Sequence, residues 1–311
     1  MIAGLVYQIS MATQSIFGGI VPNDIGGFAP KDIGGFAPND NGGSVPNVTS
    51  FDDVISLTSR NSSAMSVTSS MVFTSENGTV CDECDVAEIF SPPRLSPRAD
   101  LWGLRGGFSH DLTTGYDLLT TLGRSQSWHE LQSSKPGVLI VSPPCTWYSA
   151  IQNLNMHRYS ADVREARSRD AGQLLGYALR CCKEQLLCGR GFVFEHPWKA
   201  SSWKLPAVTE FLCLDGVATI DFDQCATGLQ GPNGQPIEKR TRLMTNMPQI
   251  VEVFSKLQCK CKVKHLNIEG ACLGVRLGPY CQVYTPALCD QLLGCSASYI
   301  HGDDLENSEG F

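Results

Sequence analysis

Residues 138–149 read Val-Leu-Ile-Val-Ser-Pro-Pro-Cys-Thr-Trp-Tyr-Ser, and this stretch constrains the fold of the chain more than any other. The first four residues form an unbroken apolar run, typical of a strand that is buried on both faces. Two prolines then end the strand, because proline has no N–H for a sheet ladder. Cys145 follows at the carboxyl end, the edge where ligands bind in open α/β sheets. The alternative is that Cys145 is a small buried hydrophobic residue, as many free cysteines are.

Strands and helices alternate along the chain from residue 86 onward. We expect strands at 86–90, 108–112, 138–141, 191–197, 218–222 and 241–245, and helices at 98–104, 118–131, 160–188, 206–214 and 286–293. This alternation predicts an α/β fold with a doubly wound, mostly parallel sheet. The strands that lead to Cys145 and Glu195 are joined by one long helix, so a right-handed crossover would make them neighbours at one sheet edge.

Residues 1–80 differ in composition from the rest of the chain. An eight-residue repeat with a Gly-Gly pair starts at Pro22, Pro30 and Pro38, and a serine- and threonine-rich tract follows it. Such a repeat prevents a helix and interrupts any strand. We therefore expect a disordered N-terminal region at 1–80, a folded domain at 81–295 and a flexible acidic tail at 296–311.

Composition bears on location and partners. No apolar run reaches the ~20 residues of a membrane span, and the first twenty residues lack the basic start of a signal peptide. We therefore expect the 14 cysteines to be reduced thiols of an intracellular protein, with the nucleus as one location. The net charge is −7, but residues 158–204 carry nine basic and five acidic side chains. This excess is either a solvated helix face or a patch for phosphates.

Five short motifs resemble those of the cytosine-5 DNA methyltransferases. Residues 144–149 (Pro-Cys-Thr-Trp-Tyr-Ser) resemble the Pro-Cys-Gln-x-Phe-Ser motif, and residues 195–197 (Glu-His-Pro) stand where the family has Glu-Asn-Val. The others are residues 88–90 (Glu-Ile-Phe), similar to the Asp-Leu-Phe that opens the cofactor loop; 117–118 (Asp-Leu), similar to the Asp-Ile that contacts adenine; and 239–242 (Lys-Arg-Thr-Arg), similar to Gln-x-Arg-x-Arg. The likeness covers roughly residues 86–295 and is closest to divergent methyltransferase-like domains encoded in protist retroelements.

The resemblance implies a class I, Rossmann-like methyltransferase fold with S-adenosylmethionine as cofactor and a nucleic acid, DNA rather than RNA, as partner. Cys145 would add to C6 of cytosine, Glu195 would bind its N3 edge, and Arg242 or Arg240 would lower the pKa of the thiol. The cofactor residues implied are Glu88, Phe90, Asp111, Asp117 and Pro144, with Asp111 on the ribose. The chain departs from the family at residues 91–94 (Ser-Pro-Pro-Arg), where the family has glycines, and at His196.

Two other functions remain open. One is a catalytically inactive, retroelement-derived domain that binds nucleic acid or protein. The other takes residues 142–145 (Ser-Pro-Pro-Cys) as a variant of the Asp-Pro-Pro-Tyr motif of amino-methyltransferases. That motif requires an aromatic residue at position 145, so we rank this function last.

The remaining cysteines bear on metal binding. Cys81 and Cys84 have C-x-x-C spacing without a second pair, so they indicate a domain boundary. Cys259, Cys261 and His265, with Cys272 beyond, could supply four zinc ligands. Their spacing matches no standard finger, so we expect buried thiols there and assign no metal ligand.

We predict that residues 1–80 are dispensable for folding, because the repeat and the polar tract cannot bury enough apolar surface to offset chain entropy. A chain that starts near Asn77 should be soluble and should melt at the same temperature as the full chain. Calorimetry of both proteins tests this, and loss of cooperative unfolding in the shorter chain would refute it.

Overall fold

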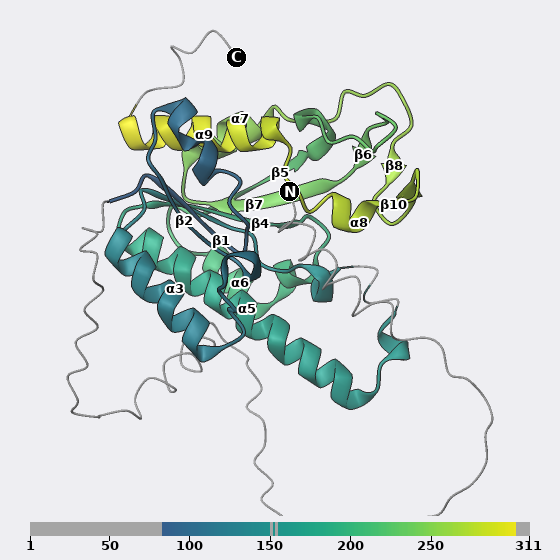
Figure 1. Cartoon of the computed structure of the whole chain (residues 1–311), viewed down its shortest axis with the longest axis horizontal. Helices are drawn as coiled ribbons and strands as arrows, with labels where there is room; N and C mark the ends of the chain where they lie inside the picture. The colour runs from purple at the N-terminus through teal and green to yellow at the C-terminus, as the bar shows by residue number, and fades with distance from the viewer. Residues whose placement is uncertain (1–82, 150–151, 153–154, 303–311) are drawn as a thin grey trace, which may run out of the picture.

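A six-stranded sheet forms the centre of the computed structural model, which describes residues 83–149, 152 and 155–302 (Figure 1). The strand order is β2-β1-β3-β4-β7-β5. Strand β7 runs in the opposite direction to the other five strands of this sheet. The strands are β1 (Val86–Ile89), β2 (Gly106–His110), β3 (Val138–Val141), β4 (Gly191–Pro197), β5 (Ala218–Asp223) and β7 (Arg240–Thr245). The predicted α/β chain with a mostly parallel sheet is thus confirmed, whereas the predictions for residues 1–80 lie outside the described residues.

Helices cover both faces of the sheet (Figure 1). One face carries α3 (Thr121–Ser134), α5 (Ala161–Leu187) and α6 (Pro206–Leu212), and the other carries the 3-10 helix η1 (Ser96–Trp102), α7 (Pro248–Ser255) and α9 (Pro286–His301). The shorter 3-10 helices are η2 (Leu112–Thr114), η3 (Thr146–Tyr148), η4 (Met156–Arg158), η5 (Ser201–Lys204) and η6 (Gln224–Thr227). Among the residues described, no helix combines the length and apolarity that crossing a bilayer requires.

Strand β3 shows why the sheet needs two helical layers. Leu139 and Val141 pack in the core under α5, whereas Val138 and Ile140 pack in the core under α9. Successive residues of a strand point to opposite faces of the sheet, and helices cover both faces here. All four side chains are therefore buried. The apolar run that the sequence analysis singled out is therefore the centre of a doubly covered sheet.

A small unit of short elements lies beside the sheet, at the right of Figure 1. It contains β6 (Ile237–Glu238), β8 (Leu266–Asn267), β9 (Ala271–Cys272), β10 (Val275–Arg276) and α8 (Leu277–Tyr280). Strand β6 pairs with β8, and β9 pairs with β10. Its core is small, formed by Leu229, Ile237, Cys272, Leu277 and Cys281, so buried apolar area contributes little to holding this unit in place.

The structure differs from the sequence predictions at three elements. Strand β7 is reversed relative to the other strands, and the expected mostly parallel sheet did not identify which strand this would be. Helix α7, of eight residues, was not predicted. Helix α9 continues to His301, so the folded part extends beyond residue 295, where the sequence analysis ended it.

The carboxylate of Glu88, at the end of β1, fixes the loop that follows this strand. Its Oε1 accepts hydrogen bonds from the backbone N–H groups of Arg94, Leu95 and Ser96 at 2.9, 2.9 and 3.0 Å. Its Oε2 accepts one from the hydroxyl of Ser91 at 2.9 Å. Glu88 is fully buried, and these donors replace the water that a carboxylate loses on burial.

Replacing Glu88 by alanine should lower the free energy of unfolding by at least about 3 kcal/mol, because three loop N–H groups lose their acceptor. Urea denaturation of Glu88→Ala measures the loss. The control is Asp100→Ala, since Asp100 is an exposed carboxylate on η1 and its removal should change stability by less than about 0.5 kcal/mol. Equal effects of the two substitutions would contradict the role of Glu88.

Candidate active site

The carboxyl ends of β3 and β4 bring Cys145 and Glu195 to one edge of the sheet. The two strands are parallel neighbours, and Val141 pairs with Phe194. Glu195 therefore comes one residue after the last pair, and Cys145 lies in the turn after β3. The sequence prediction that the two motif strands lie side by side is confirmed. Oε1 of Glu195 is buried and has no hydrogen-bond partner within the described part of the chain.

His196 connects the two motif segments. Its Nε2 lies 3.1 Å from the carbonyl oxygen of Pro143, in the turn before Cys145, and its Nδ1 lies 2.8 Å from the hydroxyl of Ser202. A carbonyl can only accept, so Nε2 carries the proton and Nδ1 accepts from Ser202. His196 is fully buried, and this burial lowers its pKa from 6.5 to about 4. The sequence analysis recorded His196 only as a departure from the family asparagine.

The thiol of Cys145 is protonated at neutral pH in this arrangement. Burial, followed by the negative charge of Glu195, raises its pKa to about 11, and the positive charge of Lys239 opposes that rise. The expectation that a neighbouring arginine lowers this pKa is not met. An ionised Cys145 therefore requires a proton acceptor or a change in its surroundings.

Arg242 is not brought to the Cys145–Glu195 pair. In the register of β4 and β7 it pairs with His196, whereas Glu195 pairs with Leu243. Side chains alternate between faces, so Arg242 lies on the opposite face of the sheet from Glu195. There its guanidinium donates to both carboxylate oxygens of Asp221, at 2.6 and 3.0 Å. Its assignment to the catalytic group therefore needs correction.

Arg240, the other candidate, shares the face of Arg242. Its guanidinium carbon lies 5.3 Å from the ring centroid of Trp198. The cation that the structure places near Cys145 is instead Lys239, whose Nζ also donates to the carbonyl of Cys281 at 2.9 Å. Lys239 was visible in the sequence as the first residue of the basic motif, but nothing there distinguished it from the arginines.

Tyr284 is a second residue that the sequence analysis missed. Its hydroxyl lies 2.7 Å from the hydroxyl of Ser142, directly after β3. Burial, and then the charge of Glu195, raise the pKa of Tyr284 well above its usual value. The guanidinium of Arg94 lies 5.6 Å from its ring. Tyr284 thus joins the segment before α9 to the carboxyl end of β3.

Four of the five predicted cofactor residues line one pocket, namely Phe90, Asp111, Asp117 and Pro144. Leu118 and Leu174 add apolar walls. The pocket lies at the carboxyl ends of β1 and β2, the edge where ligands bind in α/β sheets. Its volume is about 50 Å³, room for a few water molecules rather than a cofactor.

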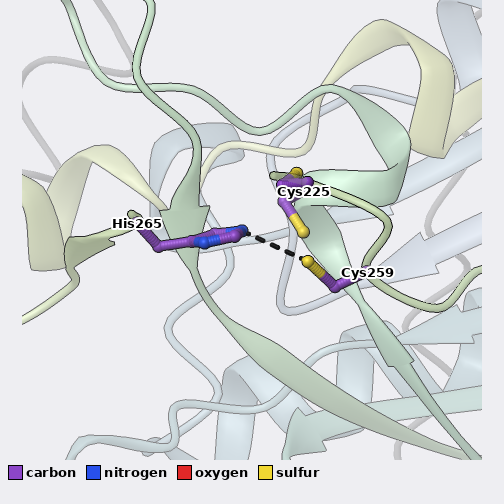
Figure 2. A group of neighbouring side chains, drawn as sticks. Cys225, Cys259 and His265 are labelled. Atoms are coloured by element: carbon purple, nitrogen blue, oxygen red, sulfur yellow. Dashed lines mark hydrogen bonds between the residues drawn. The ribbon is translucent and has the colours of Figure 1, made fainter. Parts of the chain in front are cut away.

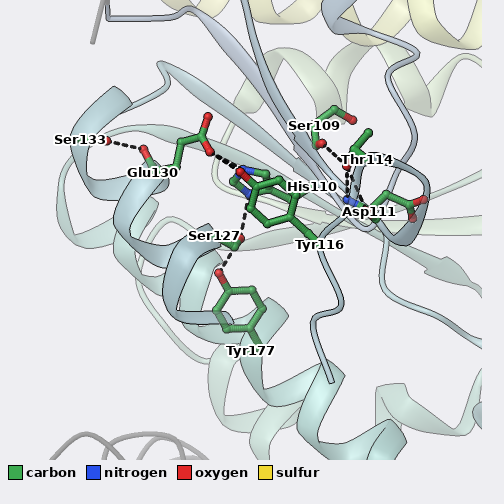
Figure 3. A network of polar contacts seen from close by, with 9 residues as sticks. All are labelled: Ser109, His110, Asp111, Thr114, Tyr116, Ser127, Glu130, Ser133 and Tyr177. Carbon is green, nitrogen blue, oxygen red and sulfur yellow. Dashed lines mark hydrogen bonds and ion pairs between the residues drawn. The ribbon is translucent and has the colours of Figure 1, made fainter. Parts of the chain in front are cut away.

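A polar network behind this pocket holds the loop after β2 (Figure 3). The buried ring of His110 lies 2.8 Å from the hydroxyl of Ser127 and 2.9 Å from Oε2 of Glu130. The hydroxyl of Tyr116 donates to the same Glu130 oxygen at 2.7 Å, and that of Tyr177 donates to Ser127 at 2.7 Å. The hydrogen bond from His110 is the main cause that lowers the pKa of Glu130. Helices α3 and α5 therefore fix the loop that carries Asp111 and Asp117.

Glu88, the fifth predicted cofactor residue, does not line the pocket. Its carboxylate is bonded to the loop N–H groups described above, so neither that carboxylate nor those N–H groups face the pocket. Phe90 forms the pocket wall with a φ of +64°, a left-handed conformation uncommon for a residue other than glycine. The lining has the apolar and acidic groups that an adenosine would contact, but the loop N–H groups are bonded to Glu88.

Three tryptophans follow the carboxyl ends of β3 and β4, and they differ in exposure. Trp203 is buried and donates its Nε1–H to the carbonyl of Pro197 at 2.8 Å, and Trp147 packs against the core. Trp198 is 38% exposed. Lys199 and Arg240 lie 5.1 and 5.3 Å from its ring centroid. Trp198 is the one of the three that a partner could reach from solvent.

Comparisons of the chain with protein-family models, with curated proteins and with solved structures return no match. The function must therefore be argued from the site itself.

We predict that the protein loses stability as the pH falls from about 6.5 to about 4. In this range the histidine of the unfolded chain takes up a proton, whereas buried His196 remains neutral because its pKa is lowered to about 4. The unfolded state then binds more protons, which favours it by up to about 3 kcal/mol.

The measurement is urea denaturation at several pH values for the wild type and His196→Gln, whose amide can bond to the same neighbours without titrating. The substitution should remove this part of the pH dependence. Two stability curves that stay parallel from pH 7 to pH 4 would contradict the assignment.

Proposed function

We propose that this chain is a cytosine-5 methyltransferase-like protein that acts on nucleic acid, with Cys145 and Glu195 at the reacting pyrimidine. The observation that carries the proposal is the buried, unpartnered Oε1 of Glu195 beside the Cys145 thiol. A buried carboxylate oxygen without a donor is costly, and a ligand that donates a hydrogen bond removes that cost. The edge of an unpaired cytosine, with its exocyclic amino group, is such a ligand.

The chemistry of the chain's own residues follows from their placement. The thiol proton of Cys145 must leave before Sγ adds to C6 of the ring, and we assign Glu195, whose charge acts on this thiol, as the acceptor. Protonated Glu195 then donates to N3 of the same ring, which draws electrons toward N3 and favours the addition at C6. Lys239 stabilises the thiolate while it exists. When bound, S-adenosylmethionine would supply the methyl group for C5.

Trp198 and its two cations support a nucleic-acid partner. Trp198 follows the Glu195 segment directly and is exposed, with Lys199 and Arg240 against its ring. An aromatic face flanked by positive charge suits stacking on a base next to a phosphate. A base held at Cys145 must be unpaired, so we expect single-stranded or flipped substrate. DNA as the partner, a nuclear location and a Rossmann-like fold of the methyltransferase kind belong to this proposal.

A second candidate is a binding domain without turnover. Two observations favour it: the cofactor pocket has a volume of only about 50 Å³, and the thiol pKa is about 11. In this alternative the carboxyl edge of the sheet binds single-stranded nucleic acid and no covalent bond forms.

The two candidates make different predictions for a DNA oligonucleotide that contains 5-fluorocytosine. With S-adenosylmethionine present, the enzyme should form a covalent complex that survives denaturing electrophoresis, because fluorine at C5 prevents release of the cysteine adduct. Cys145→Ser should reduce this complex at least about 100-fold, since a serine hydroxyl is far less ionised than a thiol.

The matched control is Cys188→Ser, because Cys188 is an exposed cysteine at the end of α5, and it should form the complex as the wild type does. A complex that persists in Cys145→Ser excludes Cys145 as the nucleophile. Oligonucleotide binding without any complex, in the wild type as well, would support the binding domain instead.

A further inference from the structure

Four metal-ligating side chains that the proposed mechanism does not use meet beside β5 and the small unit. The Sγ atoms of Cys225, Cys259 and Cys261 and a ring nitrogen of His265 all lie within 4.8 Å of one another. Figure 2 shows Cys225, Cys259 and His265 pointing toward one another from three different segments of the chain. Among the histidine, cysteine, aspartate and glutamate side chains that the structure describes, these four are the ones close enough to one another to hold a metal ion.

We propose that Cys225, Cys259, Cys261 and His265 bind one zinc ion. In a tetrahedral site the Zn–S distance is about 2.3 Å and the Zn–N distance about 2.0 Å, so neighbouring ligand atoms lie about 3.5–3.8 Å apart. The distance from Cys259 Sγ to His265 Nε2 is 3.4 Å, close to that value. Three thiolates and one imidazole form a Cys₃His set, a common composition of structural zinc sites. Because zinc is soft enough for sulfur and tolerates tetrahedral geometry, it is the metal that suits these ligands.

The fold, rather than the local sequence, assembles these ligands. Cys225 lies in η6, directly after β5, whereas Cys259 and Cys261 lie in the loop after α7 and His265 directly precedes β8. Asp223 fixes the loop, since its Oδ2 accepts the backbone N–H of Cys259 at 2.9 Å. Bonds of this kind hold a ligand segment in the orientation that the metal requires.

Cys272, which the sequence analysis placed with the other three, is not part of the cluster. It is buried in the small core with Ile237 and Leu277. Cys225 takes its place, although the residues around Cys225 have no metal-binding pattern of their own. The sequence analysis expected buried thiols here because the ligand spacing matches no standard finger, and this is wrong for Cys259 and Cys261, which are exposed. The assignment of no metal ligand was based on the same spacing, and the proposal departs from it.

The surroundings suit a positively charged ion and its thiolate ligands. A pocket of about 260 Å³, lined by Asp223, Glu238, Lys239 and three of the four ligands, gives an ion a path to the site. A dication with three thiolates leaves one net negative charge. The exposed side chains of Lys260, Lys262 and Lys264 alternate with the ligands along the loop and would offset that charge.

The site would be structural, because four protein ligands leave no open position for a substrate. It would fasten residues 259–265 to η6, in a unit whose own core has few apolar side chains. Metal binding would then supply stability that apolar burial does not. This proposal does not depend on the methyltransferase-like function, since metal content and stability are its readouts.

The test is the zinc content of the full chain, grown with zinc and purified without chelator. We expect about one zinc per chain by mass spectrometry for the wild type, and at least about tenfold less for Cys225→Ser and Cys259→Ser. Two matched controls should keep the ion. They are Cys213→Ser, at an exposed cysteine after α6, and Cys272→Ala, at the cysteine that the structure excludes.

A second measurement covers variants that fail to fold. Wild-type protein stripped with EDTA under reducing conditions should melt at a lower temperature and recover with Zn²⁺. Titration with Co²⁺ should give the visible d–d bands of tetrahedral cobalt together with thiolate charge-transfer bands. Both signals should be absent from Cys259→Ser and present in Cys213→Ser.

Three outcomes would overturn the proposal. One is a wild-type chain without zinc that does not respond to Zn²⁺ or Co²⁺ after reduction. Another is a disulfide among Cys225, Cys259 and Cys261 that persists in protein kept reduced during purification. The third is zinc that is lost in Cys272→Ala but kept in Cys225→Ser, which would place the ion on other ligands.

Discussion

The parallel pairing of β3 with β4 is the constraint on which the rest of the structure depends. Each strand is apolar on both faces, so each must lie inside the sheet with helices on both sides. Each strand also ends near a proline, so the chain turns away from the sheet after both strands at the same carboxyl edge. The hydrogen bond of His196 to the carbonyl of Pro143 then ties the two turns together. The position of Glu195 relative to Cys145 is a consequence of this strand pair, not of a separate active-site loop.

The burial that accompanies assembly of the site also opposes ionisation of the Cys145 thiol, which the proposed reaction requires. A partly buried thiol near a carboxylate prefers its proton, and the pKa of Cys145 is accordingly raised to about 11. One lysine does not offset both effects. Reactivity would therefore depend on what a ligand changes: a base that binds to Glu195 removes the repulsion on Cys145 and leaves Lys239 as the dominant charge.

The sequence predicted those parts of the structure that local pattern determines. The bounds of β3 and β4 were predicted correctly, because apolar runs bounded by prolines leave little choice. The direction of β7 was not predictable, because nothing in the sequence of Arg240–Thr245 distinguishes a parallel from an antiparallel strand. The register of β7 against β4 decides which face Arg242 occupies, and hence why Lys239 rather than Arg242 lies near Cys145. Cys225 could not be grouped with Cys259 either, because only the ends of β5 and α7 bring them together.

The small unit beside the sheet links the two sites. Lys239 donates to the carbonyl of Cys281, and Tyr284 reaches Ser142 from the same segment. Within residues 281–284, Cys281 is buried in the small core of this unit and Tyr284 in the large core under α9. The backbone N–H of Gln224, next to Cys225, donates to the carbonyl of Lys239 at 2.9 Å. An ion that fixes η6 to the loop of residues 259–265 would therefore also fix the backbone from which Lys239 extends. The proposed metal site would in this way help to hold the Lys239 side chain in position near Cys145.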